Sequence, residues 1–271
     1  MDGSVDGLYV IVVYRRDKQG ADRGALEVGE LLRTYGCEYD LYMMDEKGIK
    51  EPLGCDYLIV LGGDGTILAS IHALEEPETP VLAISYGRGG YLADASPQEA
   101  RRAVSALLNG NFRLDRLMRL DITIDGELIS DVVNEAYISN SLVGKVVEFD
   151  LEVERLKLQS IVADGMVFST PVGSTGYNTS LGGPLVDEEL ELIIATPVAP
   201  ITSLRPMVFS ALRRIVMKGV RGPFCAVIDG LIRHEFEKGE IVVTKSRHST
   251  VLVRTSEVSL CERRIKKRLG I

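Results

Sequence analysis

The sequence predicts two domains, an α/β domain followed by a β-rich domain, with a helix at the end of the chain. Up to about residue 110, strand-like and helix-like stretches alternate, which is typical of a parallel sheet that helices cover on both faces. Beyond that point apolar residues recur at every second position, as in antiparallel strands with one solvated face. We therefore expect domains at 1–112 and 113–248, with the strand and helix of 249–271 packing back on the first domain.

In the first domain, short apolar runs predict strands and wider apolar spacings predict helices. Because ligands bind at the carboxyl ends of parallel strands, the turns after the third and fourth strands are expected on the functional rim. Strands are expected at 8–14, 38–44, 57–61 and 81–85. Helices are expected at 21–35, where two glycines weaken the pattern, from Thr66 onward, and from the capping box Ser96-Pro97-Gln98-Glu99 to about Leu108.

The second domain begins with a predicted hairpin, 116–124 and 127–133, joined by the turn Asp125-Gly126. Residues 147–154 alternate strictly between apolar and acidic side chains, which indicates a strand with a solvated acidic face. The last predicted element is a basic helix, whose charges we interpret as a solvated face rather than a nucleic-acid or membrane contact. Further strands are expected at 190–195, 213–218, 224–228, 240–244 and 251–253, and the final helix at 257–269.

The composition excludes several classes of protein. The 271 residues are 45% hydrophobic and 26% charged, as expected of a globular protein, and the net charge of −8 argues against a nucleic-acid-binding surface. Four cysteines without a C-x-x-C pair, together with three histidines, disfavour a zinc site or disulfides and fit a reducing cytoplasm. The apolar run 8–14 is too short to span a membrane. We expect a cytoplasmic protein with no nucleic-acid or membrane partner.

The predicted strand 57–61 ends in the turn Gly62-Gly63-Asp64-Gly65-Thr66. Glycines let backbone N–H groups approach an anion, and the N-terminus of the following helix adds positive potential. Asp64 is unexpected there, because a carboxylate about 4 Å from a phosphate charge costs on the order of 4 kcal/mol at an effective dielectric near 20. We infer that Asp64 takes a proton from an attacking hydroxyl or binds a metal ion. The alternative is an acidic turn residue that caps the helix at Thr66.

Three shorter patterns carry weaker signals. The glycine-rich turn 86–92 follows the strand at 81–85, and its Arg88 could contact a phosphate; the alternative is a plain loop before a helix. Asn134 and Glu135 follow a hairpin strand, where adjacent side chains point to opposite faces, so that one of them could face a ligand. A capped turn explains this pair as well. Asp229-Gly230 is predicted to be a simple turn.

A longer motif runs from Asp164 to Pro184, and hydroxyls and glycines dominate it after residue 168. Small hydroxyls and bare N–H groups suit a polyhydroxylated, phosphorylated ligand, and Tyr177 offers a surface for stacking a base. The alternative, a long flexible loop, is disfavoured by the apolar residues and prolines of the motif. The segment 173–176, Gly-Ser-Thr-Gly, does not have the G-x-S-x-G spacing of a hydrolase nucleophile.

Together these motifs resemble the NAD kinase family. The turn at 62–66 is similar to its first signature, Asn134-Glu135 to its Asn-Asp/Glu pair, and 164–177 with 182–184 to its second signature. Residues 87–92 are similar to its G-x-x-G-F-L element, with Tyr91 in place of Phe. The order and spacing match over about residues 8–245. The sequence departs from the family at Val162, where many members carry a basic residue, and at Leu231, where Gln is frequent.

The resemblance implies transfer of the γ-phosphoryl group of ATP, or of polyphosphate, to the 2′-hydroxyl of the adenosine ribose of NAD, with a divalent metal ion, expected to be Mg²⁺. It implies a Rossmann-like first domain, a β-sandwich second domain, and assembly as a homodimer or homotetramer. Asp64 is then the catalytic proton acceptor. The phosphates would contact Gly62, Gly63, Gly65, Thr66 and Arg88. The dinucleotide would contact Asp64, Gly65, Asn134, Glu135, Lys145, Asp164, Thr175, Gly176, Tyr177, Asn178, Thr179 and Ser180.

Three other functions are weighed against this interpretation. A diacylglycerol-type lipid kinase also uses Gly-Gly-Asp-Gly-Thr, but the acidic net charge and the hydroxyl-rich second motif disfavour it. A non-catalytic NAD(P) sensor would keep the binding motifs, yet it has no use for Asp64 beside phosphate. A Rossmann oxidoreductase would need G-x-G-x-x-G after a strand, which this sequence lacks. The residues leave open the phosphoryl donor, the redox state of the acceptor and feedback by NADP(H).

Overall fold

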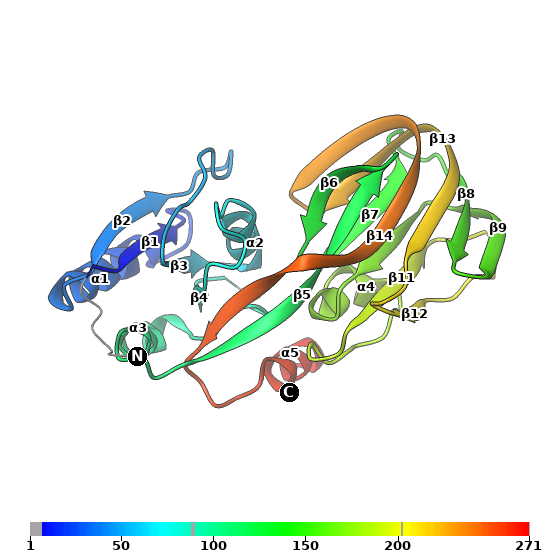
Figure 1. Ribbon diagram of the computed structural model, residues 1–271. Helices are drawn as coiled ribbons and strands as arrows, with labels where there is room; N and C mark the ends of the chain where they lie inside the picture. The colour runs from blue at the N-terminus through cyan, green and yellow to red at the C-terminus, as the bar shows by residue number, and fades with distance from the viewer. Residues whose placement is uncertain (1–6, 88–89, 202, 271) are drawn as a thin grey trace. The chain divides into compact units, whose positions relative to one another are not determined.

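The structure, a computed structural model, describes residues 7–87, 90–201 and 203–270. The chain forms two compact units, one comprising Met1–Leu117 and Ser249–Ile271, the other Met118–His248. Figure 1 follows the elements from blue at the N-terminus to red at the C-terminus. None of the helices in the described ranges is long and apolar enough to cross a membrane.

The first unit contains a parallel sheet, as the alternating pattern predicted. Its strands are β1 (Tyr9–Tyr14), β2 (Glu38–Met43), β3 (Tyr57–Gly62), β4 (Val81–Ser85) and the end of β14 (Ile232–Arg254). In the order β2-β1-β3-β4, each strand runs parallel to its neighbour, and β14 joins β4 where Leu252 pairs with Val81. Residues 58–61 of β3 are completely buried. A strand covered on both faces reads as an apolar run without alternation.

Helices cover both faces of this sheet. They are α1 (Ala21–Thr34), α2 (Asp64–His72) and α3 (Ala100–Leu108), which is preceded by the 3₁₀ turn η1 (Pro97–Glu99). A fourth helix, α5 (Leu260–Leu269), follows β14. Helices α1 and α3 pack on each other and share one core with β1, β3 and β4, whereas α2 packs on β3 and β4 with apolar residues outside that core. The predicted capping box is confirmed, because the N–H of Ser96 donates to Oε2 of Glu99 at 2.8 Å.

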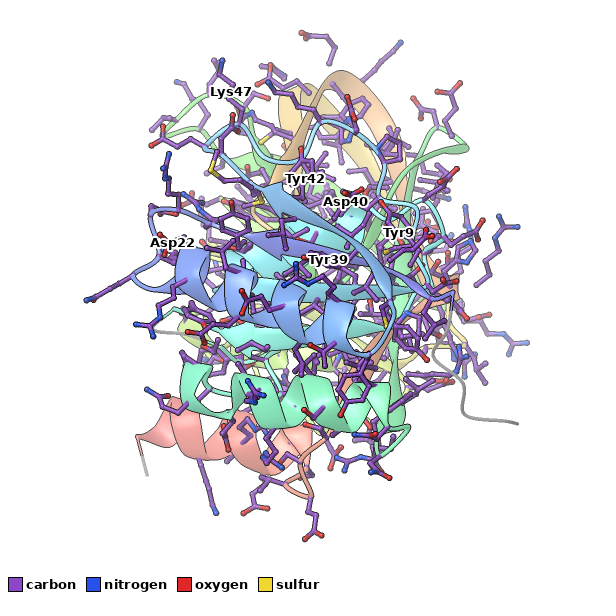
Figure 2. All side chains as sticks on the ribbon, turned by 90° about the vertical axis from the view of Figure 1, so that its left-hand side faces the viewer. Tyr9, Asp22, Tyr39, Asp40, Tyr42 and Lys47 are labelled. Carbon is purple, nitrogen blue, oxygen red and sulfur yellow. The ribbon has the colours of Figure 1, made fainter. Side chains whose placement is uncertain are left out.

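Both glycines that weaken the α1 pattern make room for tyrosine rings. A Cβ on Gly24 would lie 2.2 Å from the hydroxyl of Tyr86, and one on Gly29 would lie 2.7 Å from the ring of Tyr39. Figure 2, which looks onto α1 and the edge strand β2, shows Tyr39 beside the helix. Tertiary packing therefore outweighs the low helix propensity of glycine at these positions.

The C-terminal segment belongs to the first unit, as predicted. Arg254, at the end of β14, donates to the carbonyl oxygen of Leu92 at 3.1 Å, and Arg263 of α5 donates to that of Ala93 at 2.6 Å. Thr255 adds two hydrogen bonds to Oδ2 of Asp94, through its N–H at 3.0 Å and its hydroxyl at 2.6 Å. The segment after β4 is thus attached to the C-terminal strand and helix by hydrogen bonds.

The second unit is β-rich. Its strands are β5 (Arg113–Ile124), β6 (Glu127–Val132), β7 (Glu135–Asn140), β8 (Val147–Val153), β9 (Leu156–Ala163), β10 (Gly165–Ser169), β11 (Leu192–Val198), β12 (Met207–Ser210), β13 (Ile215–Ile228) and most of β14. The strand order is β12-β11-β10-β7-β13-β14; in addition, β8 pairs with β13 and with β9, and the hairpin β5-β6 pairs with β14 through β5. Inward-facing apolar side chains of these strands form one core.

Several predicted strands of this unit were wrong in extent. The stretches 213–218 and 224–228 form one strand, β13, whose pairing with β14 shifts between Met217 and Val220 and again between Arg221 and Phe224. Likewise, 240–244 and 251–253 lie on the single 23-residue strand β14. The bulges interrupt the alternation of apolar residues, so a continuous strand looks like two. Strands β7, β9, β10 and β12 were not predicted. Helix α2 begins at Asp64 rather than Thr66.

Candidate active site

The first glycine-rich turn lies at the carboxyl end of β3, between that strand and α2. Gly63 is the N-cap residue, in an extended conformation, and the backbone N–H of Thr66 donates to its carbonyl oxygen at 2.9 Å. The helix has nine residues, so its first N–H groups and its dipole face the turn. This is the arrangement in which a helix N-terminus binds an anion.

The glycines of the two turns have different neighbours. A Cβ on Gly62 would lie 2.5 Å from Cβ of Thr66, and one on Gly87 would lie 2.9 Å from Cα of Gly63. The N–H of Tyr86 also donates to the carbonyl oxygen of Gly62 at 2.9 Å. The two turns therefore pack backbone to backbone on one rim of the sheet, as expected. By contrast, a Cβ on Gly65 would meet nothing within 4 Å, so this residue borders open space.

Asp64 is the first residue of α2, but it does not cap the helix. The N-terminus has no side-chain cap, and Oδ1 of Asp64 instead accepts a hydrogen bond from the N–H of Leu92 at 3.1 Å. The side chain is partly exposed. The alternative that Asp64 only caps the helix is therefore not what the geometry shows. Arg88, the expected phosphate contact of the second turn, lies outside the described residues.

Asn134 and Glu135, at the start of β7, each carry a buried oxygen without a hydrogen-bond partner among the described residues. These atoms are Oδ1 of Asn134 and Oε2 of Glu135. Buried polar atoms are nearly always paired, and an unpaired one costs about 1–3 kcal/mol. Two such atoms on consecutive residues indicate a place where a polar ligand completes the hydrogen bonding.

The environment of Glu135 also changes its ionisation. Burial, and secondly the negative charge of Asp229, raise the pKa of Glu135 to about 8, while the backbone N–H of Tyr177 acts in the opposite direction. At neutral pH the carboxyl group therefore carries a proton in the free protein. A protonated carboxyl can donate one hydrogen bond and accept others, which suits a ribose hydroxyl.

The second signature folds into a compact structure instead of a loop. It comprises β10, a 3₁₀ turn η2 (Val172–Thr175) and a short helix α4 (Tyr177–Ser180). A Cβ on Gly173 would lie 2.0 Å from the carbonyl oxygen of Asn134, and one on Gly176 would lie 2.7 Å from Oε2 of Glu135. The glycines of this motif therefore let its backbone lie directly against the Asn134-Glu135 pair.

The side chain of Asn178 holds this motif together. It is completely buried, donates to the carbonyl oxygens of Ser174 and Pro184 at 3.0 and 2.9 Å, and accepts from the hydroxyl of Thr196 at 2.7 Å. Thr179 adds a hydroxyl bond to Ser174 at 2.5 Å. The amide of Asn178 is thus occupied within the protein, so its contribution to a ligand site is to shape the backbone around it.

The other residues predicted to contact the dinucleotide differ in how much of each is exposed to solvent. Tyr177 is 38% exposed, and its ring meets that of Tyr137 edge-to-face at 5.5 Å. Thr175 is buried, whereas Asp164, between β9 and β10, and Ser180 are exposed. Lys145 is exposed in the loop between β7 and β8, and among the described residues no hydrogen bond or ion pair involves its ammonium group.

Asp229 was missed as a site residue, because the sequence presented it as a simple turn. Its carboxylate accepts hydrogen bonds from three consecutive backbone N–H groups, those of Val133, Asn134 and Glu135, at 2.9, 2.7 and 2.9 Å. One signal was available: Asp229-Gly230 follows an apolar strand, as Asp64-Gly65 does. The partners, however, are 94–96 residues away in the chain.

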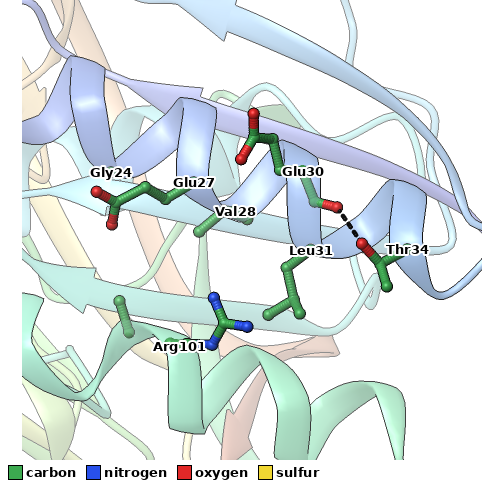
Figure 3. Close-up of a pocket in the computed structure, with 8 residues that line it drawn as sticks. Gly24, Glu27, Val28, Glu30, Leu31, Thr34 and Arg101 are labelled. Atoms are coloured by element: carbon green, nitrogen blue, oxygen red, sulfur yellow. Dashed lines mark hydrogen bonds between the residues drawn. The ribbon is translucent and has the colours of Figure 1, made fainter.

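A cavity of about 250 Å³ lies elsewhere in the first unit, between α1 and α3. Figure 3 shows the carboxylates of Glu27 and Glu30 on α1 and the guanidinium of Arg101 on α3 around it. None of its lining residues belongs to the glycine-rich turns. This cavity therefore contributes nothing to the chemistry considered above.

Comparisons with known proteins agree with the motifs. The ATP-NAD kinase N-terminal domain model matches residues 17–112, and the ATP-NAD kinase C-terminal domain model matches 133–255. An NAD kinase from Methanoculleus marisnigri is 33% identical over 257 residues, with 92% of this chain and 94% of that protein covered. One from Thermococcus gammatolerans is 35% identical over 263 residues, with 90% and 93% covered.

Solved structures show the same fold. A crystal structure of an NAD kinase from Archaeoglobus fulgidus in complex with ATP has a TM-score of 0.81 and 26% identity, covering 97% of this chain and all of that one. Yeast NADH kinase complexed with NADH has a TM-score of 0.83, with 98% and 88% covered, and at 20% identity it shows the fold alone. The α/β first domain, the β-rich second domain and the resemblance of the motifs are confirmed. The chain belongs to the NAD kinase family.

Proposed function

We propose that this protein transfers the γ-phosphoryl group of ATP to the 2′-hydroxyl of the adenosine ribose of NAD, which yields NADP and ADP. The observation that carries the proposal is the position of Asp64: a carboxylate in an anion-binding turn, beside a helix N-terminus, that does not cap the helix. Family membership supports the same reaction.

Asp64 is proposed as the general base. A ribose hydroxyl is a weak nucleophile at neutral pH, so removal of its proton by a carboxylate accelerates the reaction roughly 10²–10⁴-fold. The hydroxyl oxygen forms a bond to the γ-phosphorus, the bond from this phosphorus to the β,γ-bridging oxygen breaks, and ADP leaves. The proton passes to the Asp64 carboxylate. Positioning and charge neutralisation supply most of the remaining acceleration, because the transition state of phosphoryl transfer is loose.

The first turn is proposed to hold the phosphates. Backbone N–H groups around Gly62, Gly63 and Gly65 and the N-terminus of α2 provide the positive potential that an acidic chain otherwise lacks. Thr66 stays a proposed phosphate contact, although its side chain is buried against Gly62 and its N–H donates to the carbonyl oxygen of Gly63 at 2.9 Å. Arg88 stays a proposed phosphate contact. Polyphosphate is a second donor that such a turn would accept, since it presents the same phosphoryl oxygens.

A divalent ion, expected to be Mg²⁺, fits this turn as an ion that binds together with the nucleotide phosphates. Within the described residues, Asp64 belongs to no group of three or more Asp, Glu, His or Cys side chains spaced to hold a metal. Mg²⁺ is commonly bound through one or two carboxylates together with the oxygens of substrate phosphates. The oxygen ligands of the ion would therefore come mainly from the phosphates of the nucleotide, the ion would neutralise phosphate charge, and the Asp64 carboxylate would remain the proton acceptor.

The second unit is proposed to bind the dinucleotide. The unpaired oxygens of Asn134 and Glu135 would pair with ribose or base groups, and Tyr177 would stack against a base. The backbone of Thr175, Gly176, Thr179 and Ser180 would line the ligand, shaped by Asn178. Asp164 and Lys145 are exposed and are proposed to reach outer polar groups of the dinucleotide. We also propose a homodimer or homotetramer, which sedimentation velocity would test.

The decisive test is a coupled assay. The purified protein is incubated with NAD, ATP and Mg²⁺, and NADP is read through an NADP-specific dehydrogenase. We expect NADP formation that requires all three. A sensor would bind NAD without forming NADP, and a lipid kinase would instead phosphorylate diacylglycerol in vesicles; either result would overturn the proposal. Replacing ATP by polyphosphate, and NAD by NADH, then defines donor and acceptor.

A further inference from the structure

The turn at the end of β13 is linked to the start of β7 by four hydrogen bonds. Oδ1 of Asp229 accepts from the N–H groups of Asn134 and Glu135 at 2.7 and 2.9 Å, and Oδ2 accepts from that of Val133 at 2.9 Å. The N–H of Asp229 donates in return to the carbonyl oxygen of Glu135 at 2.9 Å. The side chain is only 6% exposed, so water does not compete for these bonds.

From this geometry we infer that Asp229 is a positioning residue for dinucleotide binding. Its carboxylate fixes the backbone of residues 133–135, so that the unpaired oxygens of Asn134 and Glu135 face the ligand. The inference rests on the proposed function, in which these two residues bind NAD. Asp229 itself acts only through the backbone of its neighbours and is not placed in contact with the substrate.

An ordinary Asp-Gly turn in the same unit shows what folding alone requires. Asp125, in the hairpin turn between β5 and β6, has the same left-handed φ of 50° as Asp229. Its Oδ1 accepts a single N–H, that of Glu240, at 2.8 Å, and its N–H donates to the carbonyl oxygen of Glu240 at 2.9 Å. Asp229 accepts two N–H groups more than Asp125 does. Two of its three donors are Asn134 and Glu135, so these bonds exceed the single one with which Asp125 holds its turn.

The negative charge of Asp229 has a second consequence for Glu135. Asp229, at the end of β13, is the charged side chain that raises the pKa of Glu135, after burial, and α4 contributes the backbone N–H of Tyr177. An Asp229→Asn substitution keeps the shape of the side chain, removes this charge, and turns an NH₂ group toward an N–H donor. It therefore loosens the backbone of 133–135 and lowers the pKa of Glu135 at once.

The experiment compares Asp229→Asn with Asp125→Asn in the full-length protein. For Asp229→Asn we expect a KM for NAD at least tenfold higher, a KM for ATP changed by less than threefold, and a downward shift in the pH midpoint of the KM for NAD. Asp125→Asn should leave both KM values and the midpoint as in the wild type. The inference is overturned if Asp229→Asn retains the wild-type KM for NAD and the wild-type midpoint, or if Asp125→Asn has the same effects.

Two further measurements keep the outcome decisive. If Asp229→Asn does not fold, Asp229→Glu retains the charge but displaces the carboxylate; a native melting temperature with at least tenfold weaker NAD binding supports the inference, and native binding refutes it. NAD binding is measured by calorimetry, without turnover. A wild type that binds NAD but forms no NADP would reject the proposed function and leave the role of Asp229 in binding to be decided by the same titration.

Discussion

The backbone N–H of Leu92 donates a hydrogen bond of 3.1 Å to Oδ1 of Asp64. The carbonyl oxygen of Leu92 accepts in turn from Nη1 of Arg254 at 3.1 Å. One residue thus connects the proposed general base to a fully buried guanidinium at the end of β14. A carboxylate that is held by a fixed backbone donor loses rotamer freedom before substrate arrives, and such preorganisation favours proton transfer.

An Asp64→Asn substitution is expected to separate binding from turnover. The amide keeps the size of the side chain but cannot accept a proton, so kcat should fall roughly 10²–10⁴-fold. NAD affinity, measured by calorimetry, should change by less than about threefold. Asp22→Asn is the matched control, because Asp22 is likewise an acid in the first turn of a helix of this unit. Turnover retained in Asp64→Asn would reject the base.

Two glycine substitutions distinguish a ligand-facing position from a packing position. Gly65→Ala adds a methyl group in open space, so its melting temperature should stay within about 2 °C of the wild type while the KM for ATP rises. Gly87→Ala places a methyl group 2.9 Å from Cα of Gly63, where backbone must move, and should lower stability by about 1–3 kcal/mol. Thermal melting and KM for ATP are measured on both variants. If Gly65→Ala leaves the KM for ATP unchanged, the proposed phosphate contact at Gly65 is wrong.

The sequence predicted those parts of the fold that depend on neighbours in the chain. The buried run 57–61, the capping box at Ser96 and the alternation at 147–154 all appeared where expected. Strand β7 was missed because it begins and ends with polar residues, Glu135 and Asn140, which leaves no continuous apolar run. Strand β13 was split because its bulges break the alternation.

The site residues that lie in local motifs could likewise be predicted from the sequence, whereas those defined by distant contacts could not. Motifs identified Asp64 and the Asn134-Glu135 pair, because each lies in a distinctive local pattern of residues. The role of Asp229 depends on partners about 95 residues away, and the buried amide of Asn178 on α4 is paired with the hydroxyl of Thr196 on β11. The local pattern of a single sequence does not identify the distant partners in contacts of this kind. Periodicity reports which face of an element is apolar, and it does not report which distant backbone a side chain meets.

The ionisation of Glu135 predicts a pH dependence of stability. Its pKa is about 8 in the folded protein and 4.5 by its ordinary value, so the folded state binds the proton more tightly. The protonated Glu135 therefore contributes fully to the unfolding free energy below pH 4.5. This contribution is lost as the pH rises from 4.5 through 8, by about 1.4 kcal/mol for each pH unit between the two pKa values. Glu135→Gln should therefore be less sensitive to pH than the wild type between these values.

Urea unfolding at several pH values checks this expectation. The difference in unfolding free energy between Glu135→Gln and the wild type should grow in favour of Gln as the pH rises toward 8, and then level off. Glu148→Gln, which replaces an exposed carboxyl on β8, serves as the control and should show no such trend. A constant difference between Glu135→Gln and the wild type across this range would show that Glu135 does not titrate there.

The two arginines that contact Asp115 should differ in their contributions to stability. Arg254 is 3% exposed and donates to Asp115 at 3.0 Å, whereas Arg113 is exposed and donates to the same carboxylate at 3.3 Å. Removing the buried partner leaves a charge poorly compensated, so Arg254→Met should cost roughly 3 kcal/mol, and Arg113→Met less than about 1 kcal/mol. Because Leu92 loses a donor, Arg254→Met should also lower kcat at temperatures where it remains folded. Urea unfolding measures the loss of stability, and steady-state kinetics measure kcat. Equal losses of unfolding free energy in the two variants would show that burial of Arg254 does not increase the contribution of its ion pair to stability.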